Sequence, residues 1–150
     1  MRKLWFVPFL AVAAIAVVVT PFLTNSEIQG SLSPEKFVKE YIELVKAKDH
    51  ESLVDLVIDD RFNDDREVKL KTYKTLEEGV SPLEDYEIKN VKSVTEDKAT
   101  VITVIEYEDG SVEQVPMHLV KKDKEWKLHI SRGNALDDED FKLIKQPDGI

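Results

Sequence analysis

The chain has 150 residues, of which 30 are acidic and 21 are Lys or Arg, giving a formal net charge of −9, and it contains no cysteine. This length is typical of one domain. The lack of cysteine excludes disulfide bonds, thiolate zinc sites and cysteine nucleophiles. The acidic balance argues against nucleic acid as a partner, because a protein that binds nucleic acid needs a basic face to neutralise phosphates.

The clearest local signal is an uncharged run of 20 residues, 4–23, which follows Arg2 and Lys3. A helix of this length spans about 30 Å, the thickness of the hydrocarbon core of a lipid bilayer. The basic pair favours a cytoplasmic N-terminus. We therefore expect a single-pass anchor in the cell membrane with the rest of the chain outside. Cleavage as a signal peptide near Thr24 is the alternative, and the protein would then be secreted.

Helical signals follow a short polar stretch. Ser33 can cap a helix, with Pro and Glu in its first turn, and apolar spacing predicts that this helix covers 34–48. Asp49 can cap a short second helix that reaches a charged break at 59–65. A third helix is expected over 65–78.

Beyond residue 82 the apolar period changes to two, which predicts four strands, at 86–94, 99–107, 112–120 and 126–131. A slip in the alternation indicates a β-bulge near Asn90. Asp109-Gly110 predicts a hairpin turn, and Pro116 places the third strand at an edge or at a bulge. The expected fold is α+β, with three helices packed on one face of a curved four-stranded antiparallel sheet.

The segments PEKFVKEY (34–41), KDHESL (48–53) and DKEWKL (123–128) resemble the nuclear transport factor 2-like superfamily, which has a cystatin-like cone, and in particular its small exported bacterial domains. The resemblance covers residues 33–132. Because this fold hosts isomerases, dehydratases, ligand carriers and interaction modules, it does not choose a function. The chain then divides into an anchor or signal segment (1–24), a linker (25–33), a cone-type domain (34–135) and an acidic tail (136–150).

The three histidines are predicted to be exposed and not to bind metal. His50 lies in the first turn of the second helix, and His118 and His129 alternate with the apolar residues of their strands. A cross-strand surface pair of His118 and His129 is the alternative. No spacing among the three predicts a metal site.

Acidic residues give no catalytic motif. Enzymes of the superfamily place an Asp or His inside the cone, and Glu106 is the nearest candidate here, but both faces of its strand are equally apolar. The run 59–65 has Asp64 where a calcium loop needs Gly, and Leu70 where it needs Glu, so a solvated loop is expected. The run 137–140 is expected to be a solvating tail, with an acidic tail that binds a partner as the alternative.

Three tyrosines are the candidates for ligand binding. Tyr41 and Tyr73 lie on predicted helices and Tyr107 on a predicted strand, so they are placed to line a pocket between helices and sheet, with core packing as the other interpretation.

We expect a non-catalytic interaction module of the bacterial cell envelope, without cofactor or metal, that is anchored in the lipid bilayer by residues 4–23 and binds another envelope protein or a peptide. A small-molecule-binding cone and an isomerase or hydrolase remain as alternatives. A large apolar cavity would favour the small-molecule binder, and an exposed apolar patch on a filled cone would favour the protein partner. A buried carboxylate with a raised pKa would favour the enzyme.

Overall fold

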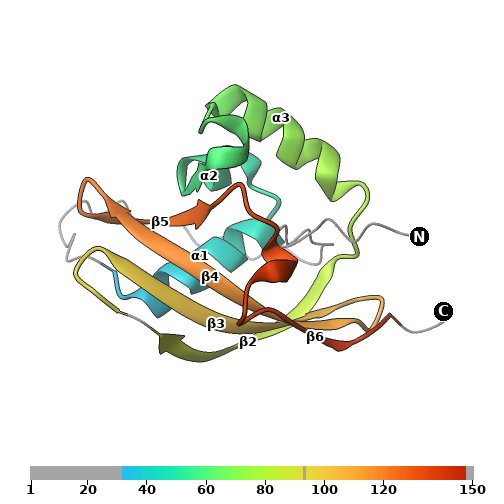
Figure 1. Cartoon of the computed structure of the whole chain (residues 1–150). Helices are drawn as coiled ribbons and strands as arrows, with labels where there is room; N and C mark the ends of the chain where they lie inside the picture. The colour runs from blue at the N-terminus through green and yellow to red at the C-terminus, as the bar shows by residue number, and fades with distance from the viewer. Residues whose placement is uncertain (1–31, 93, 148–150) are drawn as a thin grey trace, which may run out of the picture.

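Residues 32–92 and 94–147 are described by the computed structural model of the chain. The helices are α1 (Pro34–Lys46), α2 (His50–Asp55) and α3 (Arg66–Glu77), with the 3-10 turns η1 (Asp60–Phe62) and η2 (Ala135–Asp137). The strands are β1 (Val57–Asp59), β2 (Leu83–Lys92), β3 (Lys98–Tyr107), β4 (Val112–Lys122), β5 (Glu125–Ile130) and β6 (Lys142–Lys145). The strands form one curved sheet with α1 along its concave face (Figure 1).

All three helices begin at a capping side chain, which was predicted for Ser33 and Asp49 and is also found at Asp65. The side chains of Ser33, Asp49 and Asp65 each accept a hydrogen bond from the backbone N–H three residues later, at 3.3, 3.1 and 3.0 Å. Each cap satisfies one of the N–H groups that the first turn of a helix leaves without a partner.

The four predicted strands pair antiparallel as expected. The sheet nevertheless has six strands and is mixed, so the prediction was wrong in number and missed the parallel strand β1. Its order is β1-β5-β4-β3-β2, with β6 also paired to β4. Val57 and Ile58 of β1 were expected at the end of the second helix and Asp59 in the charged break, but the three residues pair in parallel with Leu128–Ile130 of β5. Residues of β6 were expected in a tail and pair with Val112–Gln114 of β4. Strands of three and four residues are too short for an apolar period to reveal them.

Two turn predictions are confirmed. The register of β2 against β3 shifts between Ile88 and Asn90, where a bulge was expected. Gly110 adopts a φ of 77° in the turn between β3 and β4, a conformation that glycine tolerates without steric cost.

Pro116 explains a gap at one edge of β4. β6 pairs with this edge only up to Gln114, and β5 only from Leu119 onward. In the described ranges no strand pairs with residues 115–118 on that side. A proline has no N–H for a ladder bond, so the strand is unpaired at the position where pairing would be weakest.

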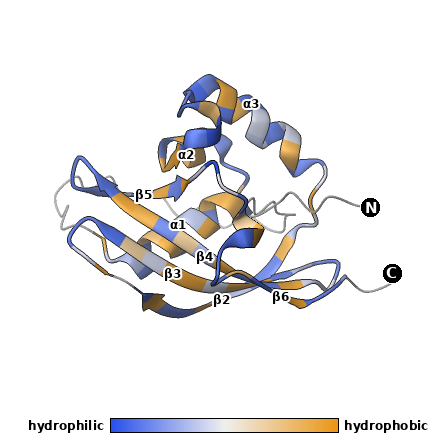
Figure 2. Cartoon of the chain, in the orientation of Figure 1, coloured by the Kyte–Doolittle hydropathy of each residue, from blue (hydrophilic) through white to orange (hydrophobic). Residues whose placement is uncertain are grey.

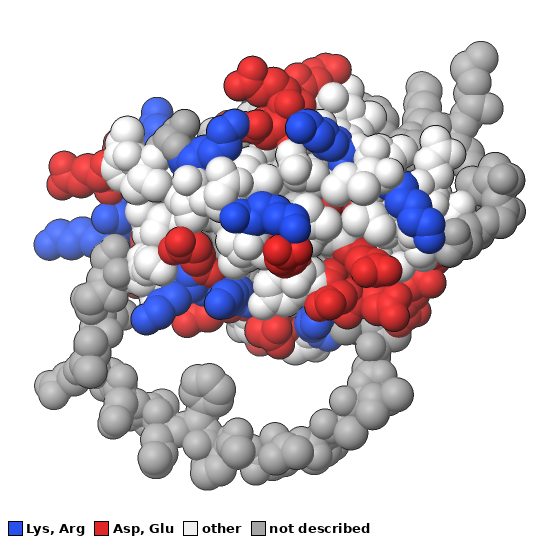
Figure 3. Space-filling model, turned by 90° about the horizontal axis from the view of Figure 1, so that it is seen from below, with Lys and Arg blue, Asp and Glu red and all other residues white. Residues whose placement is uncertain are grey.

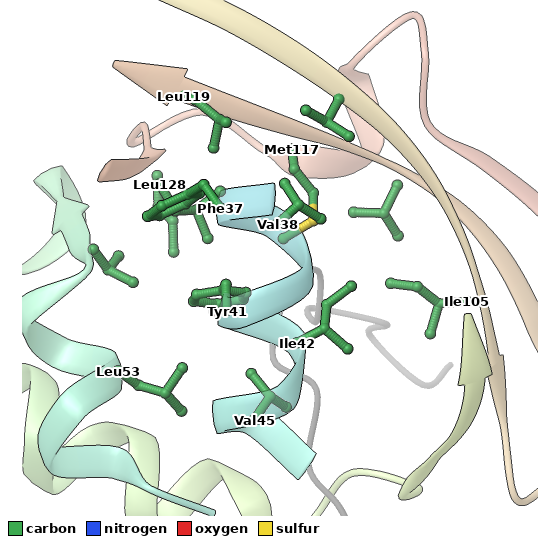
Figure 4. Packing of buried hydrophobic residues seen from close by; sticks show 14 of the residues in the cluster. Phe37, Val38, Tyr41, Ile42, Val45, Leu53, Ile105, Met117, Leu119 and Leu128 are labelled. Atoms are coloured by element: carbon green, nitrogen blue, oxygen red, sulfur yellow. The ribbon is translucent and has the colours of Figure 1, made fainter. Parts of the chain in front are cut away.

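The core lies between α1 and the concave face of the sheet. Figure 4 shows Phe37 and Val38 of α1 packed near Met117 and Leu119 of β4, and all four side chains are buried. Trp126 on β5 is 6% exposed and belongs to the same cluster. From β3, the cluster contains Ala99, Val101, Ile105 and Tyr107, which share one face of the strand. Apolar residues are frequent along β3 and β4, as the colouring of Figure 2 shows.

The membrane anchor expected at residues 1–24 lies outside the described residues, as does the linker up to residue 31. Between residues 32 and 147, residue 93 excepted, no helix is both long enough and apolar enough to cross a membrane.

Candidate functional site

A partly open cavity of about 1050 Å³ lies between α3, the strands β4 and β5, and the segment 131–141 that follows β5. Most of its wall is apolar, contributed by Phe62, Leu76, Val115, Pro116, Leu128, Ile130, Ala135, Leu136 and Phe141. A volume of this size is sufficient for a drug-sized organic molecule. The wall is suited to the apolar body of such a molecule.

The gap in the pairing of β4 shapes this cavity. Val115 points to the core side of the sheet and is buried, whereas Pro116 and His118 lie on the opposite face, yet all three line the cavity. The cavity therefore reaches around the unpaired edge of β4, between the ends of β5 and β6.

The segment 131–141 closes this edge from outside and is held there by acidic side chains. His118 Nε2 on β4 lies 2.7 Å from Asp138 Oδ2, and Lys92 Nζ on β2 lies 2.6 Å from Asp140 Oδ1. Because β3 lies between β2 and β4, the segment crosses β3. The acidic run expected to solvate a tail thus binds the sheet, since its basic partners are brought to it only by folding.

The charge of this segment is stabilised by its contacts. Burial acts to raise the pKa of Asp138, but hydrogen bonds from the backbone N–H of Asp140 and from His118 outweigh it and hold the pKa below its usual range.

In the view from below, acidic and basic side chains are interspersed over the surface, with uncharged atoms between them (Figure 3).

Arg61 forms part of the cavity wall and is held from behind by a buried carboxylate. Its Nε and Nη2 donate to Asp59 at 2.9 and 2.7 Å, and the Tyr73 hydroxyl donates to the same carboxylate at 2.8 Å. Asp59 is fully buried, whereas the Arg61 side chain is 24% exposed. The charge of Arg61 is therefore already balanced by Asp59.

Arg132 lies on the same wall but has neutral partners. Its Nε donates to the carbonyl oxygen of Asp60 at 2.8 Å, and its Nη2 contacts Asn63 Oδ1. Within the described ranges, no carboxylate lies at ion-pair distance from it. Neighbouring His129 Nε2 lies 2.9 Å from Asp60 Oδ2. Arg132 is therefore fixed in orientation while its charge stays unbalanced.

The three predicted ligand-binding tyrosines are in the core. Tyr41, Tyr73 and Tyr107 are buried, and none of them lines the cavity. Burial raises the pKa of all three hydroxyls, so they remain neutral. Tyr107 donates to Glu113 Oε2 at 3.3 Å, and the Tyr41 oxygen has no hydrogen-bond partner among the described residues. Their part in ligand binding stays a prediction.

Each histidine lies beside a carboxylate, which the sequence did not indicate. His118 and His129 both line the cavity, but each is paired with its own Asp. His50 Nε2 lies 2.6 Å from Glu77 Oε2, and its side chain is only 13% exposed, so the expectation of a solvent-exposed residue was wrong. Packing of α2 against α3 buries it. In the part of the chain described, no three potential ligands are grouped to hold a metal ion.

Thr100, His118 and Asp138 form a hydroxyl–imidazole–carboxylate chain. Thr100 Oγ1 lies 3.0 Å from His118 Nδ1, and the other ring nitrogen contacts Asp138. Hydrolases use this order of groups. Thr100 does not line the cavity, however, so the chain does not present a nucleophile to it. Glu106, the candidate acid, is exposed, because its register places it on the outer face.

Sequence reasoning missed Arg61 and Arg132. Arg61 lies in the charged break that was expected to be a solvated loop, and Arg132 follows the last predicted strand with no motif around it. Neither carries a local signal of its role, because the cavity brings together segments about 70 residues apart.

Comparison with known proteins does not assign this chain to a family. A scan against models of protein families and a search of curated proteins find no match. A crystal structure named "Putative NTF2-like transpeptidase", from Campylobacter jejuni, is similar at 15% identity and a TM-score of 0.48, covering 67% of this chain and 100% of that chain. The arrangement of α1 on a curved sheet is the cone that the sequence resemblance implies.

Proposed function

We propose that this chain is a non-catalytic binding module of the cell envelope whose cavity holds a small molecule with an apolar body. The observation that carries the proposal is the cavity of about 1050 Å³ with its mostly apolar wall. Concave, largely apolar pockets with a few polar groups are typical of small-molecule sites. A small-molecule binder was an alternative at the level of sequence, and the open cavity beside the packed core supports it.

The polar groups of the wall support binding rather than catalysis. Arg61, His118 and His129 are each already paired with a carboxylate. Burial raises the pKa of Glu113, as expected of a catalytic acid, but Glu113 does not line the cavity. A catalytic site needs a tuned group within reach of the substrate.

The proposed location rests on the sequence. The uncharged run 4–23 and the preceding basic pair support a single membrane crossing with the domain outside. Protease added to intact cells should digest the domain. If the domain resists until the cells are lysed, the proposed orientation is wrong.

Ligand binding can be tested with a neutral fluorescent probe, N-phenyl-1-naphthylamine. The full-length chain in nanodiscs of uncharged lipid would be titrated, with empty nanodiscs as the blank. Thr72 of α3 lines the cavity, whereas Thr75 on the same helix is exposed and does not line it. Thr72→Phe should weaken saturable binding about tenfold or more by filling the site. The matched Thr75→Phe should bind as the wild type does.

Equal binding by Thr72→Phe and the wild type would place the probe elsewhere. A wild-type signal no greater than that of empty nanodiscs would contradict the proposed function directly.

A protein or peptide partner is the second candidate, and β6 favours it. Leu143 and Ile144 are 41% and 55% exposed, and β6 pairs with β4 alone among the described strands. A strand with exposed apolar side chains at the side of a sheet can accept an extended peptide. A photo-crosslinking amino acid at position 144 should then capture a partner in cells, and the same group at exposed Lys124 should not. Equal capture at both positions would count against a site on β6.

A further inference from the structure

We infer that the ligand of the cavity carries an acidic group, such as a carboxylate, sulfonate or phosphate, that is bound by Arg132. This inference rests on the proposed function and names the chemical class of its ligand. It starts from the charges on the cavity wall.

Arg132 differs from the other basic side chains that line the cavity. Arg61 is paired with Asp59, His118 with Asp138 and His129 with Asp60. Among the described residues, Arg132 has no carboxylate partner. An acidic ligand group would therefore meet one unbalanced positive charge on this wall.

The guanidinium of Arg132 is positioned before any ligand binds. The carbonyl oxygen of Asp60 and the side-chain oxygen of Asn63 accept from its Nε and Nη2. Both acceptors are neutral, so they fix the orientation without cancelling the charge. Nη1 makes no hydrogen bond in the described ranges and remains available to a ligand oxygen. A preorganised donor loses less conformational entropy on binding, and a charged hydrogen bond is stronger than a neutral one.

Acidic groups near the cavity act against an anion and must be weighed. Asp138, which lines the cavity, contacts His118, and Asp60 contacts His129; each contact offsets the negative charge only when its histidine is protonated. Asp137 also lines the cavity, and its side chain is exposed to solvent, where salt and water screen its charge. Arg132 is exposed as well, so solvent screens its charge too, but it contacts the ligand group directly, and this contact should outweigh the repulsion. Asp137→Asn should strengthen binding of an anion or leave it unchanged.

Two probes with the same apolar body distinguish the acidic-ligand inference from the proposed cavity function alone. N-Phenyl-1-naphthylamine is neutral, and 1-anilinonaphthalene-8-sulfonate adds one sulfonate to the same rings. On the full-length chain in neutral nanodiscs, the sulfonate probe should bind about tenfold more tightly than the neutral probe. Arg132→Gln should reduce this preference to about one, with little change for the neutral probe.

Two variants control for charge in general. Lys124→Gln removes one positive charge from an exposed position away from the cavity and should keep the preference. Arg132→Lys keeps the charge but loses the planar fork, so it should keep only part of the preference. Circular dichroism of each variant would confirm that it is folded.

The outcomes are distinguishable. If the wild type binds both probes equally, or if Arg132→Gln keeps the preference, the acidic-ligand inference fails and the proposed cavity function stands. If Lys124→Gln loses the preference as fully as Arg132→Gln, the effect belongs to overall charge and the inference also fails. If neither probe binds saturably, both proposals fail together.

Discussion

Replacing Asp59 by Asn tests whether the buried carboxylate holds η1 and α3 in place. Asp59 is fully buried and accepts four hydrogen bonds, from the backbone N–H, Nε and Nη2 of Arg61 at 3.1, 2.9 and 2.7 Å and from the Tyr73 hydroxyl at 2.8 Å. An amide in its place turns one acceptor into a donor that faces other donors. It also leaves the charge of Arg61 without a partner.

The expected cost follows from the burial of the two partners. Breaking a buried ion pair by removing one partner costs about 3–5 kcal/mol. The Arg61 side chain is 24% exposed, so water can solvate part of the guanidinium, and we expect the lower end, about 3 kcal/mol. That is a large share of the stability of about 5–15 kcal/mol that most domains have.

Urea unfolding of the full-length chain, followed by circular dichroism, measures this cost. For an m-value of about 1.5 kcal/mol/M, the midpoint should fall by about 2 M. Tyr73→Phe removes one hydrogen bond to the same carboxylate and leaves the ion pair, so its effect should be clearly smaller. Asp59→Asn combined with Arg61→Gln should recover part of the loss, because the unpaired charge is gone.

A midpoint shift under about 0.5 M for Asp59→Asn would refute the reasoning. So would an equal loss in Tyr73→Phe, because the ion pair would then contribute nothing beyond one hydrogen bond.

Three further predictions concern the core and the dependence of stability on pH. Trp126→Ala should lower the free energy of unfolding by about 3–5 kcal/mol, and a change under about 1 kcal/mol would show that the ring is not packed. Burial acts to raise the pKa of Glu77, but hydrogen bonds from Lys48 and His50 outweigh it and hold the pKa below its usual value of 4.5. The stabilisation from Glu77 is therefore present above about pH 4.5 and lost as the pH falls through the folded value, so Glu77→Gln should lower the melting temperature at pH 7 and have less effect in acid. Burial raises the pKa of Glu113, so Glu113→Gln should have the opposite sign, leaving stability at pH 7 unchanged or higher; a clear loss there would contradict the assignment.

The orientation of Glu106, the candidate catalytic acid, could not be predicted from the sequence. Both faces of the strand bearing Glu106 are apolar in the sequence, so alternation could not say which way this carboxylate points. The structure explains why both faces of β3 are apolar. Asp138 binds β4 and Asp140 binds β2, so the segment 131–141 crosses the outer face of β3 between them. Ile102 on that face is only 4% exposed. A strand covered on both faces shows no polar side.

The sequence alone determined the elements whose signals are local. Helix caps such as Ser33 act on N–H groups three residues away, and the periods of 3.6 and 2 need only one helix or one strand to be visible. For that reason the three helices, the four longer strands and the turn at Gly110 were predictable from residues next to each other in the chain.

Only the tertiary structure decided the features that depend on distant partners. Val57–Asp59 is a strand because β5, about 70 residues later, pairs with it, and Lys142–Lys145 is a strand because β4 leaves an edge for it. The same pairing leaves the edge at Pro116 open and brings Arg61 and Arg132 to one cavity. Short segments have too few residues for a periodic pattern, and the free energy of their conformation comes from contacts that exist only after the chain has folded.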